Sequence, residues 1–561
     1  MQNKNENWLI AGIITVMAII LFINLGSGEI QPWDEGLYAI RSKSILHYND
    51  FWDQTAYSSG GLYSSTYPPL TIWFISGAMS IFGENPFSVR LFSALCSIAS
   101  LIFIFLISKR AVSFRFSVLT VILTAGTFVW DKFSREGMTD IPLTFFFILT
   151  FWSVLKLKES EERKKIILFA SLFAIGFACA LMTKIVISFI PLLFVIPLLF
   201  EKGNKKWFLV IASVIAIALA SPWYIYMINH HGAVFYKALL VPHIYSIVET
   251  NSPNLGQLYY LNQLLVSNPF IIFAIILLLL LISKKLRTNI IDPGNSNFVV
   301  YSTALWFLLT FIILSMAKTK MLHYTIYMIP PAILLIVIFL NNIKMLINKP
   351  KLIWFIFIAI ITLIIWSLSP GLREDIKQIL TFHQFSIHSI IFVSIIICFI
   401  VLIISLSGNI ILKLSDNFSD SFIFVCSLLL ITNIIILNSY YKLGHSYGAE
   451  KAAGIVLKSN EKSFIYLYHE ATSSESLNPQ LAWYTNGIMN KWVNGKSCTT
   501  YPLPLTTNLA DTLNKMRKID DNIVIYYKPR EEEFAQAVIK DVSKEWTKIT
   551  YCERYIVFRR K

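Results

Sequence analysis

Charged residues are scarce in this chain. They make up 14% of its 561 residues, whereas hydrophobic residues make up 55%. A soluble domain carries roughly a quarter charged residues, so this composition excludes an ordinary soluble fold. Apolar runs long enough to cross about 30 Å of hydrocarbon recur along the chain instead. Because only a helix satisfies its own backbone groups in such a run, the spans are predicted to be helices.

Acidic residues are outnumbered by basic ones, 33 against 48, which gives a net charge of +15. A basic excess can indicate a nucleic-acid partner. Here, however, the Lys and Arg residues are not gathered into one patch. They lie mainly in short loops between apolar runs, where they set the membrane topology. We therefore expect no nucleic-acid partner, and membrane lipids as the surroundings.

Cysteine is rare, and the six residues fit no metal-binding spacing. Four lie within apolar segments, where they are expected to pack as small hydrophobic residues. Cys498 and Cys552 lie in the polar C-terminal region and could pair if that region faces an oxidising compartment. The chain also lacks a Gly-rich phosphate loop and the internal repeat typical of many transporters. The first apolar run, residues 8–25, lacks a persuasive cleavage site and is predicted to be a retained helix.

About thirteen membrane-spanning helices are predicted. They lie near residues 8–26, 87–107, 116–130, 140–156, 166–182, 185–200, 207–228, 268–283, 298–316, 322–341, 351–368, 386–407 and 421–439. Residues 166–200 are divided into two helices at Thr183-Lys184. This division, with a cytoplasmic N-terminus, places the short basic loops 108–115, 156–165, 201–206 and 284–297 inside, as the positive-inside rule requires.

The same topology predicts where the polar segments lie. Two long loops, residues 27–86 and 229–267, and the polar tail then face outward. The expected fold is an α-helical polytopic membrane domain, residues 1–439, in the cell membrane, followed by a small α/β extracytoplasmic domain, residues 440–561. In the tail, residues 463–468 and 522–527 have the pattern of strands, and residues 529–542 that of a helix.

The first outward loop begins with two adjacent acids, Asp34 and Glu35, just after the first helix. Carboxylates at the membrane edge are costly unless they are paired or hydrated, which makes them candidates for a functional site. The alternative is that they merely end a solvated loop. Residues 70–82 of this loop are apolar but too short to span, so they are predicted to form an interfacial helix.

An ordered set of motifs follows these acids. In chain order they are Asp34-Glu35, Tyr38, Tyr67-Pro68-Pro69, Phe82-Gly83, Arg90, Arg135 with Asp140, Thr183-Lys184, Pro222-Trp223-Tyr224, Lys320 with Tyr324, and Pro330-Pro331. This set resembles the GT-C glycosyltransferases, and within them the aminoarabinose-transferase-like and protein O-mannosyltransferase-like branch. The resemblance covers about residues 8–345. It implies a GT-C fold and transfer of a sugar from a polyprenyl-phosphate donor to a glycolipid, polysaccharide or protein acceptor.

The resemblance also implies roles for individual residues. Asp34 is expected to be the general base, and Glu35 to orient it or the acceptor. One base with a phosphate leaving group implies direct displacement with inversion. Donor phosphate and substrate contacts are expected from Tyr38, Tyr67, Arg135, Asp140, Lys184, Lys320 and Tyr324. Arg135 offers bidentate contacts to phosphate and Lys320 a point charge.

One pair of residues departs from the resemblance. Aminoarabinose transferases have Glu-Lys before the two prolines, whereas this chain has Thr66-Tyr67. The phosphate contact of that Lys and the metal ligand of that Glu therefore do not transfer. A divalent metal ion stays an open alternative, with His243 as its candidate ligand. A transporter or flippase for a lipid-linked substrate and a non-catalytic envelope-assembly protein also stay open.

Overall fold

The computed structural model describes most of the first 342 residues and parts of the C-terminal region. The described residues are 2–32, 34–55, 67–201, 203–239, 258–268, 270–282, 295–317, 320–342, 448–458, 463–469, 479–484, 487–488, 491–492, 497–503, 522–526, 536, 538–540 and 546–560. The predicted spans 351–368, 386–407 and 421–439, most of the predicted tail helix and His243 lie outside them. The total of about thirteen spans therefore stays a prediction.

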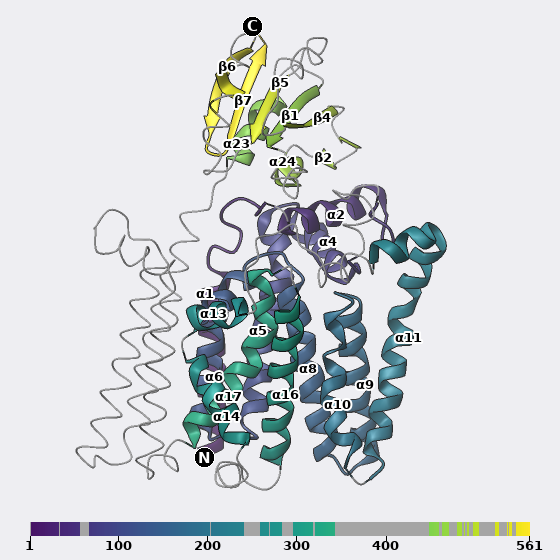
Figure 1. Ribbon diagram of the computed structural model, residues 1–561, viewed down its shortest axis with the longest axis vertical. Helices are drawn as coiled ribbons and strands as arrows, with labels where there is room; N and C mark the ends of the chain where they lie inside the picture. The colour runs from purple at the N-terminus through teal and green to yellow at the C-terminus, as the bar shows by residue number, and fades with distance from the viewer. Residues whose placement is uncertain are drawn as a thin grey trace, which may run out of the picture.

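A body of roughly aligned helices forms the first part of the chain (Figure 1). Its helices include α1 (Gln2–Phe22), α5 (Pro86–Ser108), α6 (Phe114–Ala125), α8 (Asp140–Glu159), α9 (Arg163–Leu181), α10 (Pro191–Leu199), α11 (Lys205–His231), α14 (Ile271–Ile282), α16 (Asn295–Met316) and α17 (Ile329–Asn341). Further helical segments are α7 (Phe128–Ser134), η2 (Ile187–Phe189), α13 (Tyr259–Ser267) and η3 (Leu322–Met328).

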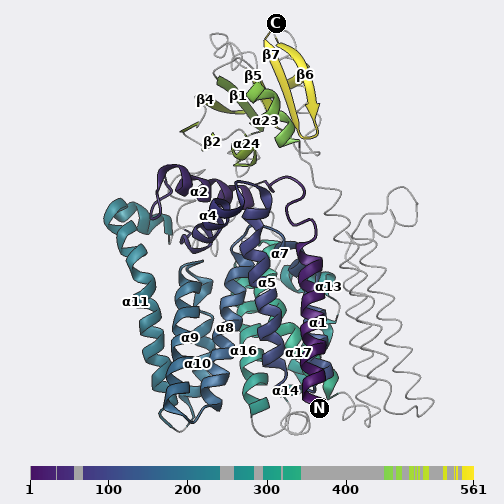
Figure 2. The same ribbon diagram turned by 180° about the vertical axis from the view of Figure 1, so that it is seen from behind.

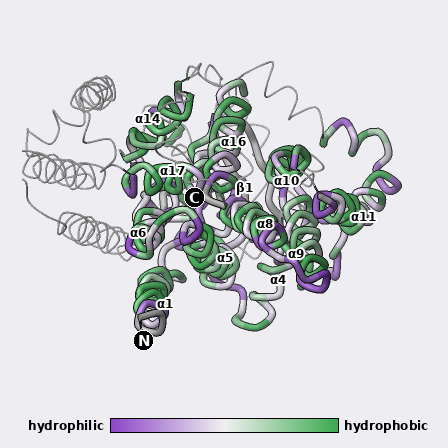
Figure 3. Tube along the Cα trace, turned by 90° about the horizontal axis from the view of Figure 1, so that it is seen from below, coloured by the Kyte–Doolittle hydropathy of each residue, from purple (hydrophilic) through white to green (hydrophobic). Residues whose placement is uncertain are grey.

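Six of the described helical segments are long and apolar enough to cross a membrane, or seven if a bent pair is one span. That pair, α6 and α7, bends by 65°. The bend was not predicted: residues 116–130 were expected to form one helix. Gly126 and Thr127 separate the two segments, and Thr127 has extended backbone geometry, so the α-helical hydrogen-bond ladder stops there. Seen along the helices, the body is predominantly hydrophobic, as Figure 3 shows.

The predicted break at Thr183-Lys184 is present. α9 ends at Leu181, and the chain resumes as η2 and α10. Pro191 stands at the start of α10, where its missing N–H costs no helical hydrogen bond. Pro330 and Pro331 start α17 in the same way after η3. These breaks place polar side chains at the end of the helical body rather than within a continuous helix.

Two helices lie across one end of the body, which we call the α2 end (Figures 1 and 2). They are α2 (Asp34–Tyr48) and α4 (Leu70–Phe82). The 13-residue helix α4 is the short apolar helix predicted at residues 70–82. α2 is buried despite its low hydrophobicity, and its buried residues include Arg41 and Lys43. Buried charges need partners, which indicates that α2 lies in a polar network.

The C-terminal strands form a sheet that lies beyond the α2 end (Figure 1). Its order is β4-β1-β5-β7-β6, from β1 (Ser463–His469), β4 (Ser497–Leu503), β5 (Asn522–Tyr526), β6 (Trp546–Cys552) and β7 (Tyr555–Arg560). β1 pairs in parallel with β4 and β5, whereas β7 pairs antiparallel with β5 and β6. Strands β1 and β5 occupy both predicted positions. Cys552, at the end of β6, is a free, buried thiol. Cys498 lies on β4, at the opposite edge of the sheet from β6, so the two cysteines do not pair.

Helices α23 (Ala449–Lys458) and α24 (Pro479–Tyr484) connect this sheet to α2. The buried Ala482 and Trp483 of α24 pack in one hydrophobic cluster with Ile40 and Ile45 of α2. Lys43 lies over the ring of Trp483, 5.0 Å from its centre. The C-terminal elements therefore contact the loop that carries Asp34 and Glu35.

Candidate functional site

Asp34 begins α2 at the α2 end of the helical body. An acid in the first turn of a helix is favoured by the partial positive charge of the helix N-terminus. Its carboxylate is partly buried and has no hydrogen-bond or ion-pair partner among the described residues. Burial raises the pKa of Asp34; His323 and Lys184 lower it, whereas Asp140 raises it further. A half-buried, unpartnered carboxylate with a raised pKa has the properties of a general base.

Around Asp34 the structure assembles polar side chains from five different segments. We call this group the Asp34 cluster; it consists of Asp34, Tyr38, Tyr67, Asp140, Lys184, His323, Tyr324 and Tyr327. The segments are α2, the residues before α4, the start of α8, the break after α9, and η3. Every predicted substrate-binding residue except Arg135 and Lys320 belongs to it.

Lys184 lies in the middle of this cluster. Its Nζ is 3.3 Å from Asp140 Oδ1 and 3.3 Å from the Tyr327 hydroxyl. The ring centres of Tyr324 and Tyr67 lie 4.7 and 5.7 Å from the same Nζ. Aromatic faces stabilise a cation. Burial alone would lower the pKa of Lys184, but Asp140 and the tyrosines raise it overall, so the side chain is held as an ammonium.

Tyrosine side chains make further contacts within the cluster. The Tyr327 hydroxyl donates a hydrogen bond to Asp140 Oδ1. Tyr38 and Tyr67 meet edge to face, with ring centres 6.2 Å apart. Burial raises the pKa of Tyr67, so its hydroxyl stays protonated and can donate a hydrogen bond. His323 and Tyr327 are additions to the predicted residues; His323 lies within the Lys320–Tyr324 motif, whereas Tyr327 follows that motif by one turn of η3.

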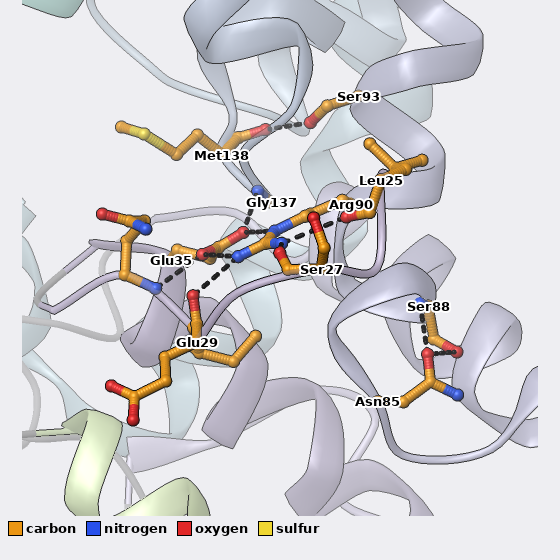
Figure 4. A network of polar contacts seen from close by, with 12 residues as sticks. Leu25, Ser27, Glu29, Glu35, Asn85, Ser88, Arg90, Ser93, Gly137 and Met138 are labelled. Atoms are coloured by element: carbon orange, nitrogen blue, oxygen red, sulfur yellow. Dashed lines mark hydrogen bonds and ion pairs between the residues drawn. The ribbon is translucent and has the colours of Figure 1, made fainter. Parts of the chain in front are cut away.

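Glu35 points into a second network, although it is the neighbour of Asp34 (Figure 4). Its Oε1 accepts from Arg90 Nε at 2.8 Å, and its Oε2 from Arg90 Nη2 at 3.1 Å. The backbone N–H groups of Gly137 and Gln31 also donate to it, at 2.9 and 2.6 Å. Both side chains of the ion pair are almost fully buried. Glu35 therefore anchors the loop, with both of its carboxylate oxygens engaged by protein donors.

Arg90 completes this anchor. Its Nη atoms donate to the carbonyls of Leu25, Ser27 and Glu29, at 3.1, 2.7 and 2.8 Å. The network therefore joins the link between α1 and α2 to α5 and, through Gly137, to the segment between α7 and α8. Figure 4 shows the Glu29 carbonyl directed at Arg90 and its carboxylate directed away. The anchor fixes the start of α2, and with it the position of Asp34.

Two predicted phosphate-binding cations have backbone partners. Arg135 donates to the carbonyls of Ile20 and Ile23 at the end of α1, at 2.6 and 3.0 Å. Lys320 donates to the carbonyls of Ser315 and Ala317 at the end of α16. Both side chains cap helix C-termini, where cations are favoured. Lys184 interacts electrostatically with Asp34, whereas Arg135 and Lys320 donate to backbone carbonyls, so a phosphate contact from either of them stays a prediction.

Comparisons with known proteins find relatives of the kinds that the motifs resemble. The family described as "Dolichyl-phosphate-mannose-protein mannosyltransferase" matches residues 66–226. An uncharacterized protein of Aquifex aeolicus (strain VF5) is 24% identical over 337 residues, which cover 59% of this chain and 63% of that protein. An undecaprenyl phosphate-alpha-4-amino-4-deoxy-L-arabinose arabinosyl transferase of Shewanella sediminis (strain HAW-EB3) is 21% identical, covering 58% and 59%. The chain thus matches less than two thirds of the length of these relatives.

Solved structures show the fold. ArnT from Cupriavidus metallidurans bound to undecaprenyl phosphate superposes with a TM-score of 0.67 at 14% identity, covering 98% of both chains. The archaeal oligosaccharyltransferase AglB from Archaeoglobus fulgidus gives a TM-score of 0.51 at 9% identity, covering 99% of this chain and 74% of that one. The protein is therefore a multi-pass membrane protein with the GT-C fold. Residues 66–226 match the protein mannosyltransferase family and the chain has the fold of ArnT, which agrees with the resemblance drawn from the motifs.

Proposed function

We propose that the protein is an inverting membrane glycosyltransferase that moves a sugar from a polyprenyl-phosphate donor to an envelope acceptor. The acceptor is a glycolipid, a polysaccharide or a protein, and the reaction takes place at the outward side of the cell membrane, at the α2 end. The observation that carries the proposal is the carboxylate of Asp34, which has no hydrogen-bond partner among the described residues, close to the ammonium of Lys184 and its surrounding tyrosine rings. ArnT, the structural relative, was crystallised with undecaprenyl phosphate, which is a lipid phosphate of the proposed class.

The chemistry divides between these two side chains. Asp34 takes the proton of the acceptor hydroxyl as its oxygen forms a bond to the anomeric carbon. The bond from that carbon to the donor phosphate breaks, and the phosphate leaves with the electron pair. Lys184 stabilises the negative charge on the leaving phosphate. One displacement inverts the anomeric carbon, and phosphate needs no general acid because it leaves readily without a proton.

Several features favour an enzyme over a transporter. Transporters place their acids in broken helices near the membrane midplane. Here Asp34 and Asp140 begin helices at the α2 end. The Glu35–Arg90 anchor is fully hydrogen-bonded and holds Asp34 in one position, as a preorganised active site requires. In this proposal residues 1–439 form the catalytic domain and residues 440–561 an extracytoplasmic domain that contacts its loop.

The test is a comparison of cells that lack the protein with cells that express wild type, Asp34→Asn or Asp50→Asn. Asp50 follows the other end of α2, so Asp50→Asn is the matched control. Mass spectrometry of the polyprenyl-phosphate sugars and envelope glycans is expected to show a sugar modification with wild type and Asp50→Asn. The same modification is expected to be absent, with its lipid-linked donor accumulating, in the deletion and in Asp34→Asn. Normal glycans with Asp34→Asn would show that Asp34 is not the base.

A further inference from the structure

A second group of ligand-type side chains lies where the chain after α2 meets the end of α11. His231 Nε2 is 2.7 Å from Asp53 Oδ2, and His230 Nε2 is 3.9 Å from the same oxygen. One ligand atom from each of the three residues lies within 4.8 Å of the others. No other group of three His, Cys, Asp or Glu side chains in the described part of the chain is this close.

The surroundings orient these three side chains. The backbone N–H of Thr55 donates to Asp53 Oδ1 at 2.9 Å, which leaves Oδ2 directed at the histidines. The ring of Tyr226 stacks on His230, with centres 5.9 Å apart. α11 ends directly after His231, because Gly232 has a φ of +59° that ends the helix. Supporting contacts of this kind are typical of metal sites, where neighbours fix the orientation of each ligand.

We propose that Asp53, His230 and His231 bind one divalent cation of the zinc class, with a fourth position open to water. Two imidazoles and one carboxylate are a ligand set that zinc accepts. With metal–ligand bonds of about 2.0–2.2 Å, the ligand atoms around a tetrahedral ion are about 3.3–3.6 Å apart. The observed separations from Asp53 Oδ2, 2.7 Å to His231 and 3.9 Å to His230, lie on either side of this range. Calcium and magnesium prefer oxygen ligands and are not favoured here.

The competing explanation is an ordinary His–carboxylate hydrogen bond. The same loop offers a matched example, because His47 Nε2 is 2.6 Å from Glu84 Oε1. Beside that pair stands Lys43, whose Nζ is 2.8 Å from Glu84 Oε2. An ammonium occupies the place that a second ligand would need, and its charge repels a cation. The two pairs therefore differ in the feature that the proposal requires, a second imidazole in place of a lysine.

The site would connect the first loop to α11. Beside Asp53, Gln54 Oε1 accepts from Arg41 at 3.2 Å, and Arg41 also donates to the Tyr67 carbonyl at 3.0 Å. Tyr67 belongs to the Asp34 cluster. A cation at Asp53 would thus stabilise the position of a segment linked to the cluster by hydrogen bonds, without taking part in the reaction.

The experiment uses the full-length protein, purified in detergent with a tag free of histidine and dialysed against a chelator. Zinc is then titrated against a chromophoric competitor, and bound metal is counted by mass spectrometry. We expect one zinc ion per chain in wild type and in His47→Ala. In His231→Ala and Asp53→Asn the affinity is expected to fall at least about 10- to 100-fold, the loss that even an outer-shell change causes. Cobalt is expected to give the visible absorption bands of a tetrahedral site only in the proteins that bind zinc.

A thermal readout separates binding from misfolding. Zinc is expected to raise the unfolding midpoint of wild type and His47→Ala, and to leave that of folded His231→Ala unchanged. Asp53→Asn keeps the shape of the side chain and an oxygen that can accept from the Thr55 N–H, so it tests the site even if His231→Ala folds poorly. Failure of folded wild type to bind zinc in excess of the chelator, or equal zinc affinity in wild type and Asp53→Asn, would overturn the proposal.

Discussion

Adjacent acids have opposite environments at the start of α2. Glu35 is enclosed by four donors from Arg90, Gly137 and Gln31, whereas Asp34 has no hydrogen-bond partner among the described residues. Successive residues on a helix project about 100° apart, so two neighbours meet different surroundings. The sequence identified the pair but not this division, because the partner that distinguishes them lies 55 residues further along the chain.

The raised pKa of Asp34 predicts the pH dependence of glycosyl transfer. Burial raises this pKa, and Lys184 is one of the groups that lower it. A base acts when deprotonated, so the rate falls as the pH drops through this pKa, which is higher than the usual value of an aspartate. Replacing Lys184 by Met removes a group that lowers the pKa, so the acid limb of kcat/KM is expected to move to higher pH. Lys109→Met, at an exposed lysine after α5, is expected to leave it in place, and an unmoved limb in Lys184→Met would contradict the assignment.

Gly137 is predicted to tolerate no side chain. A Cβ at this position would lie 2.4 Å from Val89 Cγ1 and 2.7 Å from the Val89 carbonyl oxygen, and the Gly137 N–H donates to Glu35. Gly137→Ala is expected to destabilise the protein by about 1–3 kcal/mol, as overpacking does. Gly77→Ala in α4 is the control: its Cβ would meet nothing within 4 Å, and Ala favours the helix by up to about 1 kcal/mol. Equal thermal midpoints for the two variants would refute the prediction.

Elements were easier to predict than their ends and bends. Apolar length and flanking charge predicted α5, α8, α9 and α11 to within a few residues. The 65° bend between α6 and α7 was missed, because Gly126-Thr127 gives only a weak local signal inside an apolar run. The caps made by Arg135 and Lys320 were missed for another reason. A cation near a helix end can bind a phosphate or the helix carbonyls equally well, and the choice depends on which helix lies beside it.

The contact between α23 and the first loop is predicted to depend on Glu29. Its buried carboxylate accepts from the N–H groups of Ala449 and Glu450 and from Gln480 Nε2, at 3.3, 3.1 and 3.1 Å. A negative charge at a helix N-terminus is favourable, and a hydrogen bond to a charged group contributes about 1.5–3 kcal/mol. In Glu29→Gln, amide hydrogen exchange at the start of α23 is therefore expected to accelerate about 10- to 100-fold.

Glu450→Gln is the matched control, because it removes an exposed acid from the same helix turn. Its exchange rates are expected to rise less than about 5-fold, because an exposed charge at a helix N-terminus contributes about 0.3–1 kcal/mol. If Glu29→Gln and Glu450→Gln exchange alike, the contact is held by the packing of α24 on α2, and the carboxylate of Glu29 contributes little.

At the scale of the whole molecule, composition was sufficient to predict a membrane protein. The scarcity of charge and the recurring apolar runs predicted a helical membrane protein, the ordered motifs a resemblance to the GT-C glycosyltransferases, and the structure has the fold of ArnT. The Asp34 cluster was only partly predictable. Its members come from α2, α8, η3 and the segments before α4 and after α9, and their meeting depends on how these helices pack. His323, inside the Lys320–Tyr324 motif, and Tyr327, after it, gain a role only when that packing brings His323 close to Asp34 and Tyr327 into contact with Asp140.

The proposed chemistry needs Asp34 and the C-terminal sheet on the outward side of the membrane, and this topology can be tested. Basic loops predict that Glu162 lies inside, whereas Lys451 on α23 lies with the sheet beyond the α2 end (Figure 2). Both side chains are exposed, so each can report its side as a single cysteine in a variant whose native cysteines are replaced. In intact cells a membrane-impermeant maleimide is expected to label Lys451→Cys and to leave Glu162→Cys unlabelled until the membrane is opened. The reverse pattern would place the Asp34 cluster inside and exclude a donor presented from the outer leaflet.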